Sequence, residues 1–205
     1  MFALSAGCAS RYAGAREQAV AARCALAGSP ACGGLGRSMS AQEIILAHDL
    51  WRKGAGGAPA GLAGQTDGNA YAGLDLGLAQ FADSTFTGSS FTETKFNEAQ
   101  WSACHFSNCI FSACSFDSIT IMGCTFVNCT FEKARFRLGN ISGSRLTDCK
   151  LNEVNFEQGS WSALKMHGCT GRSVRARGLR GEQVDFLGSN FEQLEFEDTV
   201  LNSTM

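Results

Sequence analysis

The stretch Phe81-Ala-Asp-Ser-Thr-Phe86-Thr-Gly-Ser-Ser-Phe91-Thr-Glu-Thr-Lys-Phe96 places a phenylalanine at every fifth residue. The same register runs without an insertion from Leu76 to Leu201, and large apolar residues fill it except at Gly171, Ala176 and Gly181. Fourteen of the 15 phenylalanines lie in this register, which excludes a chance distribution. A spacing of five fits neither the 3.6-residue period of a helix nor the two-residue period of a strand. It predicts a repeat architecture, so the sequence says more about fold than about function.

A second column of small residues stands two positions before the large ones: Ser84, Ser89, Thr94, Ala99, Cys104, Cys109, Cys114, Cys124, Cys129 and Ala134. Two inward residues in every five suit a chain that turns a corner at each repeat. This pattern resembles the pentapeptide-repeat family, whose consensus is roughly Ala-Asp/Asn-Leu-x-x; here Phe replaces the Leu, and Ser, Cys or Thr replaces the Ala. The resemblance covers Leu76 to Leu201. It implies an all-β fold, a right-handed quadrilateral β-helix (pentapeptide-repeat solenoid) in which four repeats form one coil of twenty residues.

Stacking the sequence by twenty predicts ladders of identical rings in the core. Each coil adds about 4.8 Å, the spacing of neighbouring strands. One ladder contains Phe86, Phe106 and Phe126, and another contains Phe96, Phe116, Phe136 and Phe156. Stability is then expected to accumulate coil by coil, and the two end coils need covers.

Composition excludes some classes of function. The net charge is −2, from 17 Lys and Arg against 19 Asp and Glu, so bulk charge does not indicate binding to nucleic acid or a membrane. No apolar run approaches the roughly 20 residues of a membrane span. Seven of the ten cysteines fall in the small column: Cys104, Cys109, Cys114, Cys124, Cys129, Cys149 and Cys169. Buried free cysteine acts as a small hydrophobe, and this usage suits a reducing cytoplasm.

The chain divides into three parts in this interpretation. Residues 1–38, rich in Ala, Gly and Arg, are expected to form a poorly ordered extension. Residues 39–70 are expected to hold a capping helix and a Gly-rich connector, and residues 71–205 the β-helix. Ser40-Ala-Gln-Glu43 is a capping-box sequence that predicts a helix over 41–53. The family resemblance implies that such a helix, with His48 and Trp51, forms an apolar lid on the first coil.

The C-terminal end shows no such helix in the sequence. Coils are expected to run to the end of the chain, which leaves Val200 and Leu201 on an uncovered face. Such a face favours end-to-end pairing, and we predict a homodimer through it.

A basic cluster made of Arg172, Arg175, Arg177 and Arg180 is a candidate interaction site. In linear order it looks like a nucleic-acid patch beside an acidic tail. Stacking by twenty instead places Arg137, Glu157, Arg177 and Glu197 in one column, where opposite charges pair across neighbouring coils. The ladder is the favoured interpretation, because phosphate binding requires a surface of one sign.

Two further candidates concern the coil around Gly171 and a plain face. Either Leu164, Val174, Leu179 and Val184 in the small column replace the lost volume at Gly171, Ala176 and Gly181, or the coil is weak and forms a binding site. The plain face around Trp101, Ile121, Ile141 and Trp161 carries small uncharged residues, which suit either a partner surface or a solvated one.

These observations predict a non-enzymatic protein-protein interaction scaffold in a bacterial cytoplasm, with an unknown protein partner, no direct contact to nucleic acid or membrane, and no cofactor. His48, His105 and His167 are far apart, and no catalytic motif, metal-ligand motif or phosphate loop is present. The resemblance leaves two alternatives. One is a DNA mimic that acts on DNA gyrase and protects it from quinolones; the other is a secretion-system effector or accessory protein.

Overall fold

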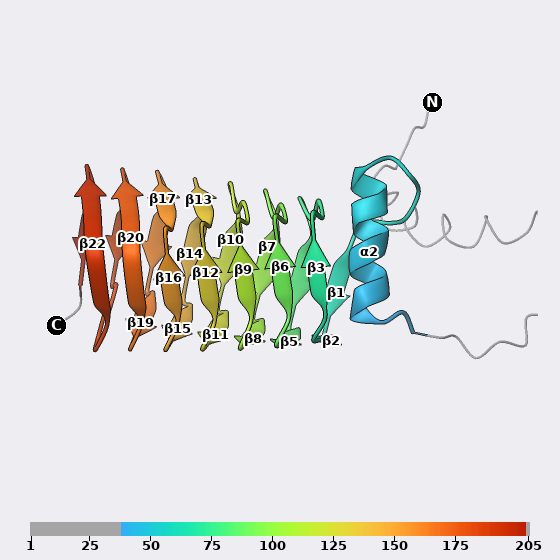
Figure 1. Ribbon diagram of the computed structural model, residues 1–205, viewed down its shortest axis with the longest axis horizontal. Helices are drawn as coiled ribbons and strands as arrows, with labels where there is room; N and C mark the ends of the chain where they lie inside the picture. Colours follow the sequence, from blue (N-terminus) through green and yellow to red (C-terminus); the bar gives the residue numbers. More distant parts are fainter. Residues whose placement is uncertain (1–37, 204–205) are drawn as a thin grey trace, which may run out of the picture. The chain divides into compact units, whose positions relative to one another are not determined.

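The computed structural model describes residues 38–203, which form one short helix followed by a parallel β-solenoid of about seven turns (Figure 1). This confirms the fold class predicted from the five-residue spacing. The helix is α2 (Ala41–Arg52). No helix in this part of the chain is long and apolar enough to cross a membrane.

Every strand pairs in parallel with strands of the neighbouring coils, and the strands lie on four faces. The first face consists of β1 (Gly61–Ala63), β4 (Gln80–Ala82), β7 (Gln100–Ser102), β10 (Thr120–Met122), β14 (Asn140–Ser142), β18 (Ser160–Ser162), β21 (Arg180–Glu182) and β23 (Val200–Asn202). The second consists of β2 (Thr66–Asp67), β5 (Thr85–Thr87), β8 (His105–Ser107), β11 (Thr125–Val127), β15 (Arg145–Thr147) and β19 (Lys165–His167).

The third and fourth faces join in one sheet. The third contains β3 (Ala70–Ala72), β6 (Ser90–Thr92), β9 (Ile110–Ser112), β12 (Thr130–Glu132) and β16 (Lys150–Asn152), and the fourth contains β13 (Arg135–Arg137) and β17 (Asn155–Glu157). The long strands β20 (Thr170–Arg177) and β22 (Asn190–Glu197) continue around the corner between the two faces.

The corners depend on a left-handed backbone residue two positions after each centre from Leu76 to Phe196. Asn108, for example, has a φ of 54° and Lys133 a φ of 52°. The amide of such a residue points along the solenoid. Asn108 N, for example, donates to the Val127 carbonyl in the next coil at 2.9 Å. Asn, Asp and Gly tolerate this conformation best, which accounts for their frequency at the corners.

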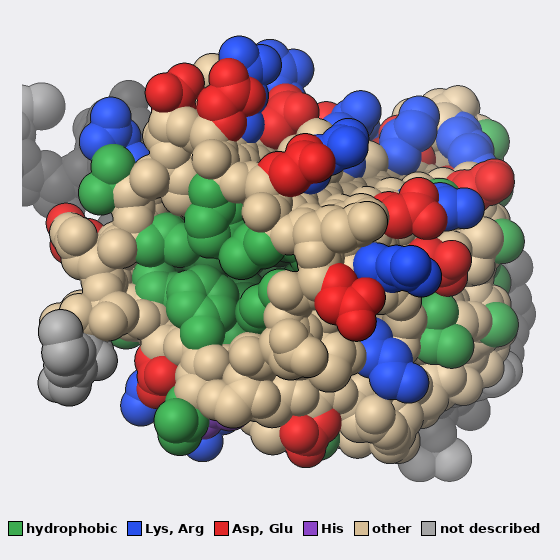
Figure 2. Space-filling model, turned by 60° about the vertical axis from the view of Figure 1, so that its left-hand side comes forward, with side chains coloured by type: hydrophobic (Ala, Val, Ile, Leu, Met, Phe, Trp, Pro, Cys, Tyr) green, Lys and Arg blue, Asp and Glu red, His purple; other side chains and the backbone are tan. Residues whose placement is uncertain are grey.

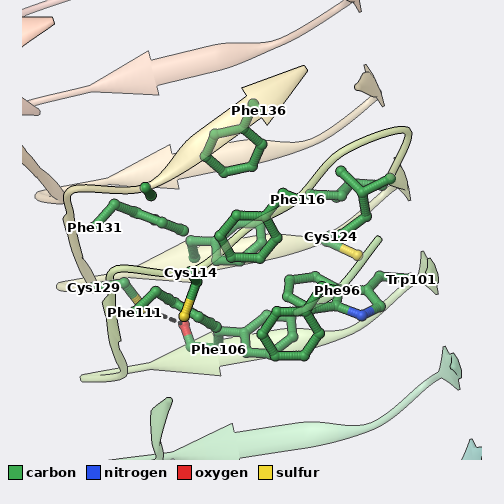
Figure 3. Close-up of a cluster of buried hydrophobic side chains, with 14 of the residues drawn as sticks. Phe96, Trp101, Phe106, Phe111, Cys114, Phe116, Cys124, Cys129, Phe131 and Phe136 are labelled. Carbon is green, nitrogen blue, oxygen red and sulfur yellow. Dashed lines mark hydrogen bonds between the residues drawn. The ribbon is translucent and has the colours of Figure 1, made fainter. Parts of the chain in front are cut away.

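The core is a set of aromatic stacks (Figure 3). Phe86, Phe106 and Phe126 lie with neighbouring ring centroids 4.8 Å apart and almost parallel. The ladder through Phe96, Phe116, Phe136 and Phe156 has centroid spacings of 5.2, 4.4 and 5.0 Å. Because the parallel register pairs residues twenty apart, each ring is held above its counterpart by the backbone hydrogen bonds.

The small column is also buried, and its thiols and hydroxyls bond to the backbone. Cys109 Sγ donates to the Phe86 carbonyl at 3.3 Å, and Cys129 Sγ to that of Phe106 at 3.4 Å. Ser189 makes the same bond to the Met166 carbonyl at 2.7 Å, so serine and cysteine are equivalent there. All seven cysteines of the column are free, and burial raises the pKa of Cys114 to about 11.

Helix α2 covers the first coil through both apolar and polar contacts. Ala41, Ile45 and His48 are buried, and Ser40 and Glu43 form the expected capping box. His48 Nε2 lies 2.8 Å from the Gly77 carbonyl, while His48 Nδ1 accepts from Ala60 N at 2.7 Å. These two bonds require the neutral tautomer with its proton on Nε2.

Trp51 differs from the expectation of an apolar lid built on His48 and Trp51. Its side chain is 37% exposed and packs beside His48, with ring centroids 5.3 Å apart. The contacts with the first coil come instead from the helix face that carries Ile45 and His48. Trp51 lies in the last turn of α2, next to the C-terminal residue Arg52.

The Gly-rich connector predicted after the helix within residues 39–70 is partly wrong, because this segment contains strands β1 and β2. The first coil therefore begins at Gly61 rather than near Tyr71. It is one residue short, since Leu62 pairs with Phe81 and Asp67 with Phe86. Asp67 thus occupies a centre position, where its buried carboxylate accepts from Tyr71 Oη at 2.8 Å and from Ser89 Oγ at 2.9 Å. The extension predicted for residues 1–38 lies outside the described residues except for Ser38.

Replacing a ring in the middle of a ladder is expected to be costly. Phe116→Ala should lower the free energy of unfolding by about 3–5 kcal/mol, because it leaves a cavity between Phe96 and Phe136. Met122→Ala, at a half-exposed residue in the adjoining strand β10, should change it by less than about 0.5 kcal/mol. Chemical denaturation followed by circular dichroism measures both. Equal effects of the two variants would contradict the stacked core.

The lid is expected to be sensitive to acid. Burial lowers the pKa of His48 from its usual 6.5, so the unfolded or undocked chain binds a proton first as the pH falls. The docking free energy should be complete above about pH 6.5 and decline below it. Hydrogen-exchange protection factors of α2 amides at pH 7.5 and pH 5 measure this. Protection that stays constant in the native chain, or that declines equally in His48→Gln, would refute the assignment; His105→Gln serves as the control.

The open end of the solenoid as a candidate interaction surface

The two ends of the solenoid differ. At the N-terminal end, α2 covers the first coil, with Asp49 accepting from Asp75 N at 2.7 Å and Arg52 paired with Asp75 at 3.1 Å. At the other end, β22 pairs only with β20 and β23 only with β21 among the strands of residues 38–203. The last described coil therefore presents an uncovered strand edge.

An apolar hollow opens at this end (Figure 2). Its volume is about 260 Å³, and only apolar side chains line it: Leu151, Phe156, Trp161, Met166, Val174, Phe186, Phe191, Leu194 and Phe196. Leu194 is 42% exposed and Phe196 is 46% exposed, whereas the equivalent Phe116 is fully buried. Apolar surface gathered around an unpaired edge is a feature of interaction sites.

The small centres of the preceding coil create this hollow. The ring ladder stops at Phe156, because Ala176 stands where the next ring would lie. Phe191 lies over Gly171 and Leu201 lies over Gly181. A methyl group added to Gly171 would lie 2.5 Å from a ring carbon of Phe191, and one added to Gly181 would lie 2.5 Å from a methyl carbon of Leu201. Val174, Leu179 and Val184 are buried, so the exchange of volume between the two columns is real but incomplete.

Val200 and Leu201, the residues predicted to form a pairing surface, lie in β23 at the same end. Val200 is 52% exposed and Leu201 is half-buried. Sequence reasoning did not single out Leu194 and Phe196, although both follow the inward pattern of the last coil. They are exposed because no strand of residues 38–203 pairs with the outer edge of β22, and the five-residue spacing does not express this.

The basic cluster is paired with acids of the last coil. Arg175 Nε lies 2.8 Å from Glu195 Oε2, Arg177 Nε 3.3 Å from Glu197 Oε2, and Arg172 Nε 4.0 Å from Glu192 Oε2. Arg180 projects from β21 on the first face and is exposed. The cluster is therefore a ladder of mixed sign, in keeping with the stacking by twenty.

The charge ladder deviates from a simple column at one point. Asp117 pairs with Arg135 at 2.8 Å, across a diagonal, rather than with Arg137 in its own column. Arg137 instead lines a hollow with Glu157 and Arg177, the residues above it in successive coils. Exposed pairs of this kind contribute about 0–1 kcal/mol each and mainly support the register.

The remaining sequence candidates do not converge on a site. His48 lies in α2, His105 in β8 and His167 in β19, where His167 Nε2 lies 2.8 Å from Asp185 Oδ2. No group of three or more His, Cys, Asp or Glu side chains in residues 38–203 could hold a metal ion. The cysteine column is buried within the core, and the plain face at β7, β10, β14 and β18 carries only uncharged outward side chains.

Comparison with known families now gives the class of the chain. The family model described as pentapeptide repeats (8 copies) matches residues 75–112, and the pentapeptide repeat region model matches residues 99–176. The chain belongs to the pentapeptide-repeat family. A comparison with curated protein sequences found no match.

Among solved structures, the chain is similar to a trypsin-treated variant of QnrB1, a plasmid-mediated fluoroquinolone resistance protein. The identity is 15% and the TM-score 0.38, over 71% of this chain and 73% of that one. The pentapeptide repeat protein Rfr23 from the cyanobacterium Cyanothece 51142 shows 10% identity and a TM-score of 0.32, over 68% and 90% of the two chains. The periplasmic alginate epimerase AlgG shows 11% identity and a TM-score of 0.29, over 67% and 44%.

Proposed function

We propose that this protein is a non-enzymatic scaffold that binds another protein through its open C-terminal end. The observation that carries the proposal is the apolar hollow at an unpaired strand edge, with Leu194 and Phe196 exposed in its lining. Family membership supports the scaffold role. Within the four faces the strands are paired with the coils on either side, whereas the open end combines apolar surface with unpaired backbone groups.

The seven free cysteines support a reducing compartment as the place of action, and we assign the protein to the bacterial cytoplasm on this basis. The homodimer predicted from the sequence uses the same end, where a second copy of the chain would be the bound protein. The secretion-linked alternative depends on the N-terminal extension, of which only Ser38 lies within the described residues.

Photocrosslinking in the native cell tests the proposed surface. A photoreactive amino acid at Val200 should yield a discrete protein adduct, because the side chain is 52% exposed in β23, the last described strand of the first face. Met122 is the matched control, since it lies on the same face and is 49% exposed in the middle of the solenoid. An adduct from Met122 alone, or none from Val200, would remove the open end from consideration. An adduct of twice the chain mass identifies a second copy.

The gyrase alternative makes a different prediction. A mimic of duplex DNA needs a surface of predominantly negative charge, whereas Arg and Glu alternate along the fourth face. We therefore expect no inhibition of DNA gyrase supercoiling at micromolar concentrations of the protein. Inhibition at or below that level, retained by the variant Val200→Ser, would establish gyrase as a target that does not depend on the open end.

A further inference from the structure

The outer edge of the last coil carries a regular pattern of charge. Along β22, Phe191, Leu194 and Phe196 line the apolar hollow, while Glu192, Glu195 and Glu197 project outward. No Lys or Arg occurs after Arg180, whereas six acids do: Glu182, Asp185, Glu192, Glu195, Glu197 and Asp198. The strand edge is therefore apolar on one side and acidic on the other.

Strand β20 shows which charges fit this edge. It pairs with β22 in parallel, and its outward residues Arg172, Arg175 and Arg177 stand opposite Glu192, Glu195 and Glu197. The cations occupy the first, fourth and sixth positions of a six-residue segment, with small or apolar residues between them. The molecule thus contains one strand that is complementary to β22 in charge and register.

The acids of β22 have this complement on one side only. In a coil that has neighbours on both sides, Glu157 stands between Arg137 of the preceding coil and Arg177 of the following coil. Glu197 stands next to Arg177, and no strand of residues 38–203 lies on its other side. In addition, the corner amides of earlier coils donate to carbonyls of the next coil. Gly178 N, for example, donates to the Glu197 carbonyl. By this pattern Gln193 and Asp198 direct their amides beyond β22.

A second copy is a poor occupant of the edge. Two copies joined end to end by a two-fold axis would bring one row of glutamates against another, and like charges on adjacent strands are destabilising. A basic segment would instead extend the alternation of sign already present between Arg137 and Glu197.

We infer that the open end binds an extended, cationic segment of a partner protein, which adds to the edge of β22 in the register of β20. Its cations would lie over Glu192, Glu195 and Glu197, and its apolar residues would enter the hollow beside Leu194 and Phe196. Main-chain hydrogen bonds supply affinity in this mode of recognition, and side chains supply specificity. The inference rests on the proposed function and specifies the partner's chemistry.

The test uses the full-length protein and a fluorescent octapeptide of residues 170–177 that carries Gly171→Phe and Ala176→Phe to fill the hollow. The matched probe has the same sequence with its three arginines changed to glutamate. Fluorescence anisotropy should show binding of the cationic peptide, and binding at least about tenfold weaker for the acidic one. The double variant Glu195→Gln and Glu197→Gln should weaken the cationic peptide by about tenfold, and added salt should do the same.

Two control variants separate the inference from the proposed function. Glu132→Gln with Glu153→Gln changes acids in the middle of the solenoid and should leave binding unchanged. Leu194→Ser removes apolar surface from the hollow at a residue that is 42% exposed, and circular dichroism verifies its fold. Leu194→Ser should weaken the binding of both peptides.

Several results would overturn the inference. If the two peptides bind equally and Leu194→Ser weakens both, the charge register is refuted while the apolar docking end stands. If neither peptide binds, the inference fails, and the crosslink at Val200 then decides the proposed function alone. Light scattering that shows a dimer at the assay concentration, dissociated by Leu194→Ser, would assign the end to a second copy.

Discussion

The parallel hydrogen bonds between residues twenty apart are the constraint on which the rest of the molecule depends. They fix which side chain lies above which, so identical residues repeated along the chain become columns in space. The same register stacks Phe116 on Phe136 and sets Arg175 beside Glu195. Core packing, thiol bonding and surface charge are therefore three results of a single backbone arrangement.

This arrangement also concentrates the possibilities for function at the ends. In the middle of the solenoid the backbone of each coil is hydrogen-bonded to the coils on both sides, and the corners are closed by amides that bond to the next coil. At the ends the strand edges and corner amides lack a neighbouring coil, so their backbone groups need another hydrogen-bond partner. Helix α2 meets the requirement at the first coil, where His48, Asp49 and Arg52 bond to the chain beneath them. The last described coil meets it only in part, with Phe191 and Leu201 folded over glycines.

The sequence predicts the interior of the solenoid well and its ends poorly, for a physical reason. The column that contains Phe86 and the column that contains Cys129 each have the same environment in every coil. The five-residue period is therefore enough to place these residues. Asp67 breaks the period, because its coil is one residue short and its carboxylate is buried among hydrogen-bond donors. The exposure of Trp51 and the depth of the hollow at Phe196 depend on what lies beyond the coil. A spacing pattern does not contain that information.

The interruption of the aromatic ladder at Ala176 has a consequence for motion. Stability in a solenoid is the sum of each coil and its contacts with its neighbours, so a coil with weaker contacts opens before the others. The last described coil rests on Gly171, Ala176 and Gly181 instead of rings, and among the coils of residues 38–203 it has a neighbour on one side only. It is therefore the unit from which the solenoid frays. Local opening there leaves the Phe86 and Phe116 stacks intact, which allows the open end to adjust its shape independently of the rest of the protein.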